Sequence, residues 1–267
     1  MGFLFPLSIG SKEFGLTQGI AYDRVSSTME DLNITHTVTS YECGANHLLK
    51  PDMFMQYCQE AAETHASRNN LGYDWSMSNG LIWVEVQGDF RFFRYPRWKE
   101  EVTVRSNTGK ASALQARRFV ELLDKDGNIL AQADLLWVLI DVDSRRPMPF
   151  KKIMDRVNIP EACPALITEE WQIADEASET ATVEFVAPKR DIDFNGHINN
   201  SAYLTWVLDT LPEAMQPTAT PTRMRINFKR ETFAGHPICI EHKRAGNQTQ
   251  HTITSDGELR AAIILEW

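Results

Sequence analysis

"DKDGNILAQADLLWVLI" (residues 124–140) and "TSDGELRAAIILEW" (residues 254–267) are two stretches of one chain with the same plan. In each, an Asp-Gly pair leads into a largely apolar run that contains a Trp. An Asp-Gly turn next to runs of this kind is typical of a β-hairpin. Aligning residues 126–127 with 256–257 places Trp137 on Trp267, so the sequence indicates an internal repeat.

The repeat continues upstream of these hairpins. "FRFFRYPRWKEEVTV" (90–104) aligns with "INFKRETFAGHPICI" (226–240), which places Phe92 on Phe228. "YECGANHLLKPDMFMQYCQEAA" (41–62) aligns with "RDIDFNGHINNSAYLTWVLDTL" (190–211), which places Asn46 on Asn195. Two copies of one supersecondary unit therefore account for most of the chain.

Each copy predicts the same order of elements: a strand, a polar loop, a helix and four more strands. Apolar spacing predicts helices at 51–69 and 200–211. Alternation and β-branched or aromatic content predict strands at 33–42, 81–95, 100–109, 114–124 and 129–142, and at 182–189, 221–231, 236–244, 247–254 and 258–266. This order favours an α+β fold in each copy, with an antiparallel sheet wrapped around a long buried helix.

The domain boundaries follow from the repeat. Residues 1–28 show no periodicity and are interpreted as an N-terminal arm or an added leader, with Met29 as the natural start. The first copy then spans 29–147 and the second spans 182–267. Residues 148–181 contain Pro149, Pro160 and Pro164 and end in an acidic run, so they are predicted to be a linker with at most one short helix.

Composition limits the class of protein. The 267 residues are 43% apolar and 24% charged, which is ordinary for a soluble globular chain, and the net charge of −9 disfavours a nucleic-acid partner. The four cysteines are scattered without a CxxC pair, which argues against zinc and suggests a reducing compartment. No run approaches the roughly 20 apolar residues of a membrane span. We therefore expect a cytoplasmic protein without a membrane span.

The loop "RDIDFNGHINN" (190–200) concentrates polar side chains and has three interpretations. An EF-hand loop needs an acidic residue at its twelfth position, and counting from Asp191 that position is Ala202, so calcium is disfavoured. The Asp and Asn residues can instead cap a turn and a helix. The third interpretation is catalytic, because Asp193, Asn195 and His197 alternate with other residues and share one face of an extended loop.

The repeat helps to choose between capping and catalysis. The first copy keeps Asn46 but has Gly44 and Leu48 where the second copy has its other two polar side chains. The position of Glu231 in the second copy is Tyr95 in the first. A purely structural role would be needed in both copies, so the polar cluster indicates an active site in the second.

Four stretches then resemble one family: "LIWVEVQGDFRFFRYPRWKEEVTV", "LLWVLIDVDSRRPMPF", "DIDFNGHINNSAYLTWVLD" and "MRINFKRET". Together these stretches resemble the acyl-acyl-carrier-protein thioesterases over residues 33–267. The resemblance implies two tandem hotdog folds in one chain, and hydrolysis of fatty acyl-carrier-protein thioesters to free fatty acid and carrier protein. It implies acyl carrier protein as the partner, with no metal and no organic cofactor.

The resemblance also implies site residues. The catalytic set falls on Asp193, Asn195, His197 and Glu231 in the second copy, while the first copy houses the acyl chain. Many plant members have Cys after that Glu, and here it is Thr232. We therefore expect the two carboxylates, and not a thiol, to perform the hydrolysis. Which carboxylate attacks or activates water stays open.

Further candidates surround this set. The amides of Asn199 and Asn200, at the start of a helix, are candidate oxyanion donors. Candidate tunnel residues, for which plain core packing is the alternative, are Met53, Met55, Tyr57 and Trp83. Candidate docking cations for the acidic carrier protein are Arg94, Arg97, Lys189, Arg190, Lys229 and Arg230.

Three other functions fit part of this evidence. They are an acyl-CoA thioesterase on the same fold, a non-catalytic acyl-binding protein and a hotdog dehydratase. The intact polar set argues against the binding protein, and the Asn-rich loop argues against the dehydratase. Chain-length preference and oligomeric state, including a homodimer, stay open at this level.

Overall fold

A computed structural model describes residues 30–110, 112–149, 177–216 and 219–267. Its strands are β1 (Leu32–Thr37), β2 (Leu81–Phe92), β3 (Glu101–Lys110), β4 (Gln115–Asp124), β5 (Ile129–Asp141), β6 (Glu179–Val186), β7 (Arg223–Phe228), β8 (Pro237–Ala245), β9 (Gln248–Ser255) and β10 (Glu258–Glu266). Its helices are α1 (Pro51–Arg68), α2 (Tyr73–Ser78) and α4 (Asn200–Thr210), with short 3-10 turns η1 (Ser40–Glu42), η2 (Lys189–Asp191) and η3 (Glu213–Met215).

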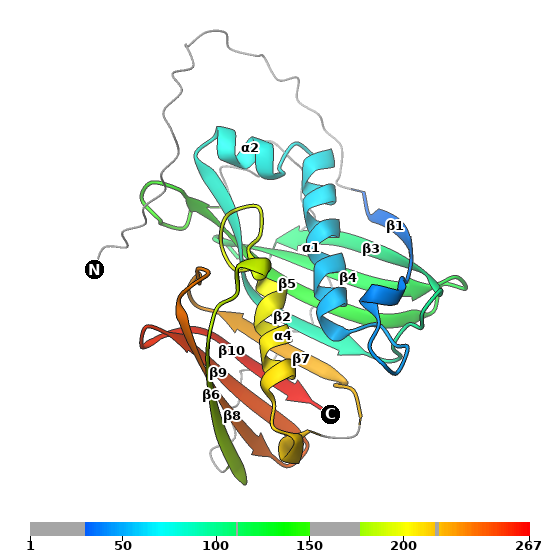
Figure 1. The fold of residues 1–267 in the computed structure, drawn as a ribbon. Coiled ribbons are helices and arrows are strands. Elements are labelled where there is room, and N and C mark those ends of the chain that lie inside the picture. The colour runs from blue at the N-terminus through cyan, green and yellow to red at the C-terminus, as the bar shows by residue number, and fades with distance from the viewer. Residues whose placement is uncertain (1–29, 111, 150–176, 217–218) are drawn as a thin grey trace, which may run out of the picture.

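The described strands form one antiparallel sheet in the order β1-β3-β4-β5-β2-β7-β10-β9-β8-β6. The first five strands belong to the first copy and the last five to the second, in mirrored order. The copies join where β2 pairs with β7, with Gln87 opposite Asn227. Figure 1 shows α1 over the strands of the first copy and α4 over those of the second. Each copy is a hotdog fold, which confirms the predicted repeat and fold class.

The two long helices form for local reasons and pack into a shared core. Pro51 is the first residue of α1, where a missing amide hydrogen does no harm. Asn199 caps α4 by accepting a hydrogen bond from the Ser201 amide. The helices meet where the Thr205 hydroxyl lies 3.2 Å from Asp52 Oδ2. One hydrophobic cluster contains Phe54 and other residues from both copies, so the halves share a single core.

The first strand of each copy differs from its predicted range. The predicted strand 33–42 ends at Thr37, because the Thr39 amide and hydroxyl both donate to the Glu42 carboxylate and close the turn η1. In the second copy the strand ends before Pro188, which has no amide hydrogen for the ladder. It also begins at Glu179, inside the predicted linker range.

The remaining predicted segments fall largely beyond these ranges. The arm predicted at 1–28 and most of the linker predicted at 148–181, where at most one short helix was expected, lie outside the described residues. Within the described ranges, no helix is both long enough and apolar enough to cross a membrane.

Candidate active site

The loop 192–198 is closed on itself by backbone bonds. Ile192 and Ile198 form an antiparallel bridge, and the Asp193 amide donates to the His197 carbonyl over 2.8 Å. Gly196 has φ +83°, a left-handed conformation that glycine adopts without strain. Asp193 Oδ1 accepts the amides of Asn195 at 2.8 Å and His197 at 3.2 Å. The Asp193 carboxylate therefore both shapes the loop and is fixed by it.

Glu231 reaches this loop from the segment that follows β7. The Ile198 amide donates to the Thr232 carbonyl over 2.9 Å, which ties the segment to the loop. As a result Glu231 Oε2 lies 3.8 Å from His197 Nε2. The Glu231 carbonyl accepts Arg260 Nη1 at 3.1 Å. The second copy therefore brings the carboxylate and the imidazole together.

The first copy also contributes to this carboxylate. Arg145, in the turn after β5, donates Nη2 to Glu231 Oε1 at 3.1 Å and to Oε2 at 2.9 Å. Both side chains are largely buried, with exposed fractions of 16% and 22%. Charge-assisted hydrogen bonds of this kind are among the stronger ones in proteins. Arg145 thus fixes the orientation of Glu231 across the boundary between the copies.

A cavity of about 530 Å³ connects these groups to the first copy. One part of its wall is polar and carries the complete predicted catalytic set: Asp193, Asn195, His197 and Glu231. Another part comes from one face of α1 and from the start of β2, and includes Gln59, Ala62, Glu63, Ala66, Ile82, Trp83 and Val84. The cavity is therefore one shared site, with polar groups from the second copy and mostly apolar walls from the first.

The predicted tunnel residues divide into two groups. Trp83 lines the cavity, and its indole Nε1 donates to the Leu71 carbonyl at 3.0 Å. Met53, Met55 and Tyr57 do not line this cavity, which favours the alternative of plain core packing. They lie in the first two turns of α1, where Met55 is buried in the core and the other two pack against it. The cavity begins further along the helix, at Gln59.

Asn199 and Asn200 also differ in what they can offer. The Asn199 amide donates to the Asp191 carbonyl at 2.9 Å, and its side chain accepts the Ser201 amide and hydroxyl, each at 2.8 Å. Asn199 is therefore a helix cap whose amide is occupied, and it is not an oxyanion donor. Asn200 is the first residue of α4, and its side chain lies 3.5 Å from Glu85 Oε2. It remains the candidate donor of the pair.

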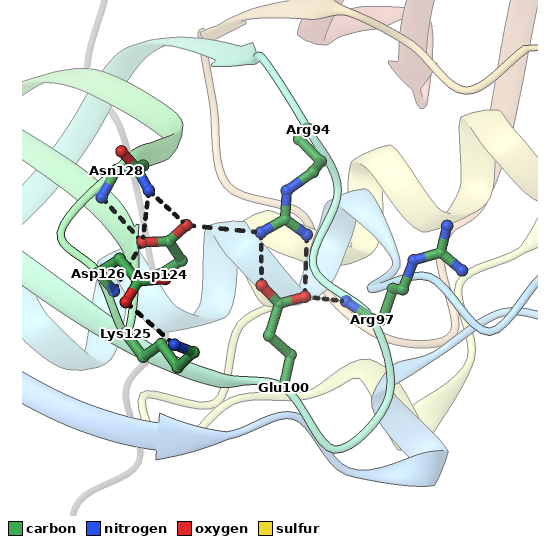
Figure 2. Close-up of polar contacts among 7 residues, drawn as sticks. All are labelled: Arg94, Arg97, Glu100, Asp124, Lys125, Asp126 and Asn128. Carbon is green, nitrogen blue, oxygen red and sulfur yellow. Dashed lines mark hydrogen bonds and ion pairs between the residues drawn. The ribbon is translucent and has the colours of Figure 1, made fainter.

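The docking candidates have different surroundings. Figure 2 shows the Arg94 guanidinium bound to Glu100 and facing Asp124, whereas the Arg97 side chain points away from Glu100. The positive charge of Arg94 is therefore largely balanced by these two carboxylates. Arg230 is 3.3 Å from Glu258, and Arg190 is 3.7 Å from Asp191.

The docking candidates also differ in position. Lys189 and Arg190 are exposed in η2, directly before the loop 192–198. Lys229 and Arg230 line the cavity. Four of the six cations therefore lie in the second copy beside the site, and Arg94 and Arg97 lie in the first.

Two further residues of the site were not predicted, because the comparison of the two copies gave no reason to select them. Arg145 follows β5 and lies beyond the aligned stretches, which end at Trp137 in the first copy. Glu85 lines the cavity on β2 and is 3% exposed, although a carboxylate inside a predicted strand gave no reason to select it. Burial raises the pKa of Glu85 to about 7, against the opposing effect of Asn200 and Gln59.

Sequence models of a known family match both copies. Residues 31–156 match the acyl-ACP thioesterase N-terminal domain, and residues 174–267 match the C-terminal domain. The chain belongs to the acyl-ACP thioesterase family. A chloroplastic acyl-[acyl-carrier-protein] hydrolase of Cuphea viscosissima is 26% identical over 241 residues, which cover 81% of this chain and 57% of the relative. The chain thus spans a little over half the length of that curated relative.

Solved structures show the same fold. An acyl-ACP thioesterase from Bacteroides thetaiotaomicron superposes with a TM-score of 0.77 at 19% identity, covering 88% of this chain and 97% of the other. The 12:0-ACP thioesterase from Umbellularia californica gives a TM-score of 0.77 at 22% identity, covering 89% and 96%. Both matches extend through the two copies, so the fused double hotdog is common to all three chains.

Proposed function

We propose that this chain hydrolyses fatty acyl-carrier-protein thioesters to free fatty acid and carrier protein, and so ends chain elongation. The observation that carries the proposal is the position of the polar set. Asp193, Asn195, His197 and Glu231 converge on one wall of a cavity whose other walls are mostly apolar. A thioester needs polar groups at the reacting carbon and an apolar channel for the chain. Family membership supports the same reaction.

The geometry favours different roles for the two carboxylates. Both oxygens of Glu231 accept from Arg145, so this carboxylate is held in place by the guanidinium and is already engaged. Asp193 is held through Oδ1 alone, and among the described residues no donor is bound to its Oδ2. Asp193 is therefore the group that activates water, and Glu231 orients His197.

The proposed hydrolysis has two steps, addition of water and loss of the thiolate. A water oxygen adds to the thioester carbon while one of its protons passes to Asp193. Asn195 and the Asn200 amide stabilise the negative charge that develops on the carbonyl oxygen. When the carbon–sulfur bond breaks, the thiolate leaves and takes the proton that Asp193 holds. The thiolate is a good leaving group, so no strong general acid is required.

The carrier protein is proposed to dock beside the catalytic loop. Lys189, Arg190 and Lys229 are exposed around this end of the cavity, and Phe194 is an exposed aromatic residue on the loop itself. Positive charge steers an acidic partner, and an exposed aromatic supplies an apolar contact. The scattered cysteines suit a reducing compartment, and we place the reaction in the cytoplasm.

The test is release of free fatty acid from a panel of acyl-carrier-protein substrates, with acyl-CoA substrates of equal chain length measured beside them. We expect a higher kcat/KM for the carrier-protein substrates. Substituting Lys189 and Arg190 by Glu should raise KM for the carrier protein and leave KM for acyl-CoA unchanged. Equal kcat/KM values for both substrate sets would favour the acyl-CoA thioesterase, and binding without hydrolysis would favour an acyl-binding protein.

A further inference from the structure

Glu85 is a buried carboxyl group that the proposed hydrolysis does not use. It lines the cavity on β2 and is 3% exposed. Its Oε1 is buried and makes no hydrogen bond of normal geometry with the described residues. Its Oε2 lies 3.5 Å from Asn200 Nδ2, and the Gln59 side chain also interacts with the carboxyl group. Burying a polar group without a partner costs about 1–3 kcal/mol, more when it is charged. An unsubstituted acyl chain offers no group that would offset this cost.

The strand is built so that Glu85 faces into the cavity. A β-bulge interrupts β2, since Glu85 pairs with Trp137 whereas Gln87 pairs with Leu136. An extra residue changes which side chains face which side of a sheet, and bulges often redirect a side chain in this way. Gly88 makes room for the Phe90 ring, 2.6 Å from where a Cβ would lie, and the same Cβ would lie 3.3 Å from Glu85 Oε1.

The carboxyl group also lies next to the reacting end of the cavity. Asn200, its neighbour at 3.5 Å, begins α4 directly after the catalytic loop and is the candidate oxyanion donor. A group bound to Glu85 therefore lies close to the thioester and not at the far end of the acyl chain. The 3-position of an acyl chain lies two carbons from the thioester carbon. That separation is on the order of the length of one side chain.

We propose that Glu85 recognises a hydroxyl group near the thioester end of the acyl chain, so that the preferred substrates are 3-hydroxyacyl thioesters. This inference rests on the proposed hydrolysis and adds its substrate class. A hydroxyl both donates and accepts, so it can supply the partner that Oε1 lacks in either protonation state. A site built to hydrogen-bond a substrate hydroxyl discriminates strongly against the analogue without it, because the buried polar group is then left unpaired.

Recognition by Glu85 should make binding of 3-hydroxy and 3-oxo chains depend differently on pH. Because burial raises the pKa of Glu85 to about 7, the group is mostly a neutral acid at pH 6 and mostly a carboxylate at pH 8. A 3-oxo group can only accept a hydrogen bond, so it pairs with the neutral acid alone. Binding of a 3-oxo chain should therefore weaken as pH rises through 7, while binding of a 3-hydroxy chain persists.

The experiment compares kcat/KM for 3-hydroxyacyl and unsubstituted acyl-carrier protein of one chain length. Wild-type enzyme should prefer the hydroxylated substrate by tenfold or more. Glu85→Leu should remove that preference, and the isosteric Glu85→Gln should keep part of it and guards against a folding defect in the first variant. Glu60→Gln is the matched control, since Glu60 is exposed on α1 and should leave the ratio unchanged.

Binding of the free acids separates this inference from the proposed reaction. Calorimetry with 3-hydroxy and unsubstituted fatty acids of the same length should show the same preference, and Glu85→Leu should abolish it. A ratio of kcat/KM that is the same in wild type and both Glu85 variants would overturn the inference while the hydrolysis stands. A wild-type chain that hydrolyses neither thioester yet binds the hydroxy acid through Glu85 would overturn the proposed function instead.

Discussion

The loops 43–49 and 192–198 have nearly the same backbone and different side chains. Each is closed by a bridge, between Cys43 and Leu49 in the first copy and between Ile192 and Ile198 in the second. Each has one residue with positive φ at the same place, His47 at +59° and Gly196 at +83°. Each follows a 3-10 turn and leads into the long helix of its copy. The duplicated backbone therefore supplies one geometry twice.

The side chains decide which copy has the polar site. In the first loop Asn46 is exposed and its Oδ1 accepts the Leu48 amide at 3.1 Å, so it serves the turn alone. Tyr95, at the place of Glu231, is 7% exposed and donates its hydroxyl to the Pro221 carbonyl at 2.6 Å. The same position therefore carries a buried packing residue, Tyr95, in the first copy. In the second copy it carries Glu231, a carboxylate that faces the cavity.

The largest expected effect comes from the polar set of the second copy. Glu231→Gln or His197→Ala should lower kcat by about 10²–10⁴-fold, since each removes a group that positions or stabilises charge in the transition state. Asn46→Ala is the matched first-copy change and should leave kcat nearly unchanged. Steady-state hydrolysis with circular dichroism to confirm folding checks both. Comparable losses in the two loops would mean that the copies share the chemistry.

A smaller loss is expected at Arg145, which lies in the first copy but holds Glu231. Arg145→Ala should lower kcat by about 10²-fold through misplacement of the carboxylate, with little change in KM. Arg145→Lys should recover part of the rate, because it keeps the charge but not the planar donor group. Arg146→Ala is the control, since Arg146 is adjacent and exposed.

Arg145 can also be tested through Glu231. If Arg145 acts through that carboxylate, the double variant Arg145→Ala with Glu231→Gln should be no slower than Glu231→Gln alone. If the rate losses of the two single variants multiply in the double variant, Arg145 acts on something other than Glu231.

A change of product, and not of rate, is expected at Trp83. Trp83→Phe enlarges the cavity in the first copy, and each additional buried methylene is worth about 0.8 kcal/mol, so released fatty acids should become longer by about two carbons. Met55→Leu conserves volume in the core and should not move the profile. Gas chromatography of the products distinguishes the two. A profile that shifts with Met55 and not with Trp83 would place the acyl chain elsewhere.

The smallest effect is expected at Tyr95, the first-copy counterpart of Glu231. Tyr95→Phe removes one buried hydrogen bond to the Pro221 carbonyl and should lower the free energy of unfolding by about 1 kcal/mol. Hydrolysis should persist at nearly the wild-type rate. Urea denaturation monitored by fluorescence measures the first quantity. A large loss of turnover in a stable Tyr95→Phe variant would give the first copy a catalytic part that its contacts do not indicate.

Much of the fold was accessible from the repeat. The alignment that placed Asn46 on Asn195 and Phe92 on Phe228 is matched by the bridges that close the loops and by the mirrored strand order. All four side chains of the proposed catalytic set line one cavity, and their catalytic role stays a prediction. Both results follow from local patterns that recur twice in one chain, so each copy tests the interpretation of the other.

The parts that sequence reasoning missed depend on contacts between distant segments. The part of α1 that meets the cavity could not be selected, because Met55 and Gln59 are four residues apart and therefore lie on the same face of the helix. The orientation of Glu85 depends on a one-residue bulge that alternation along β2 does not reveal. Arg145 contacts Glu231 across the copy boundary, and no local pattern indicates that contact.

The most direct test of the account counts working sites per chain. Wild-type enzyme in excess over labelled acyl-carrier protein should release one equivalent of fatty acid in a single turnover, and titration with substrate should saturate at one carrier protein per chain. Asp193→Asn should bind one equivalent and release almost none. Two equivalents bound per chain, or undiminished release by Asp193→Asn, would contradict a single catalytic site in the second copy.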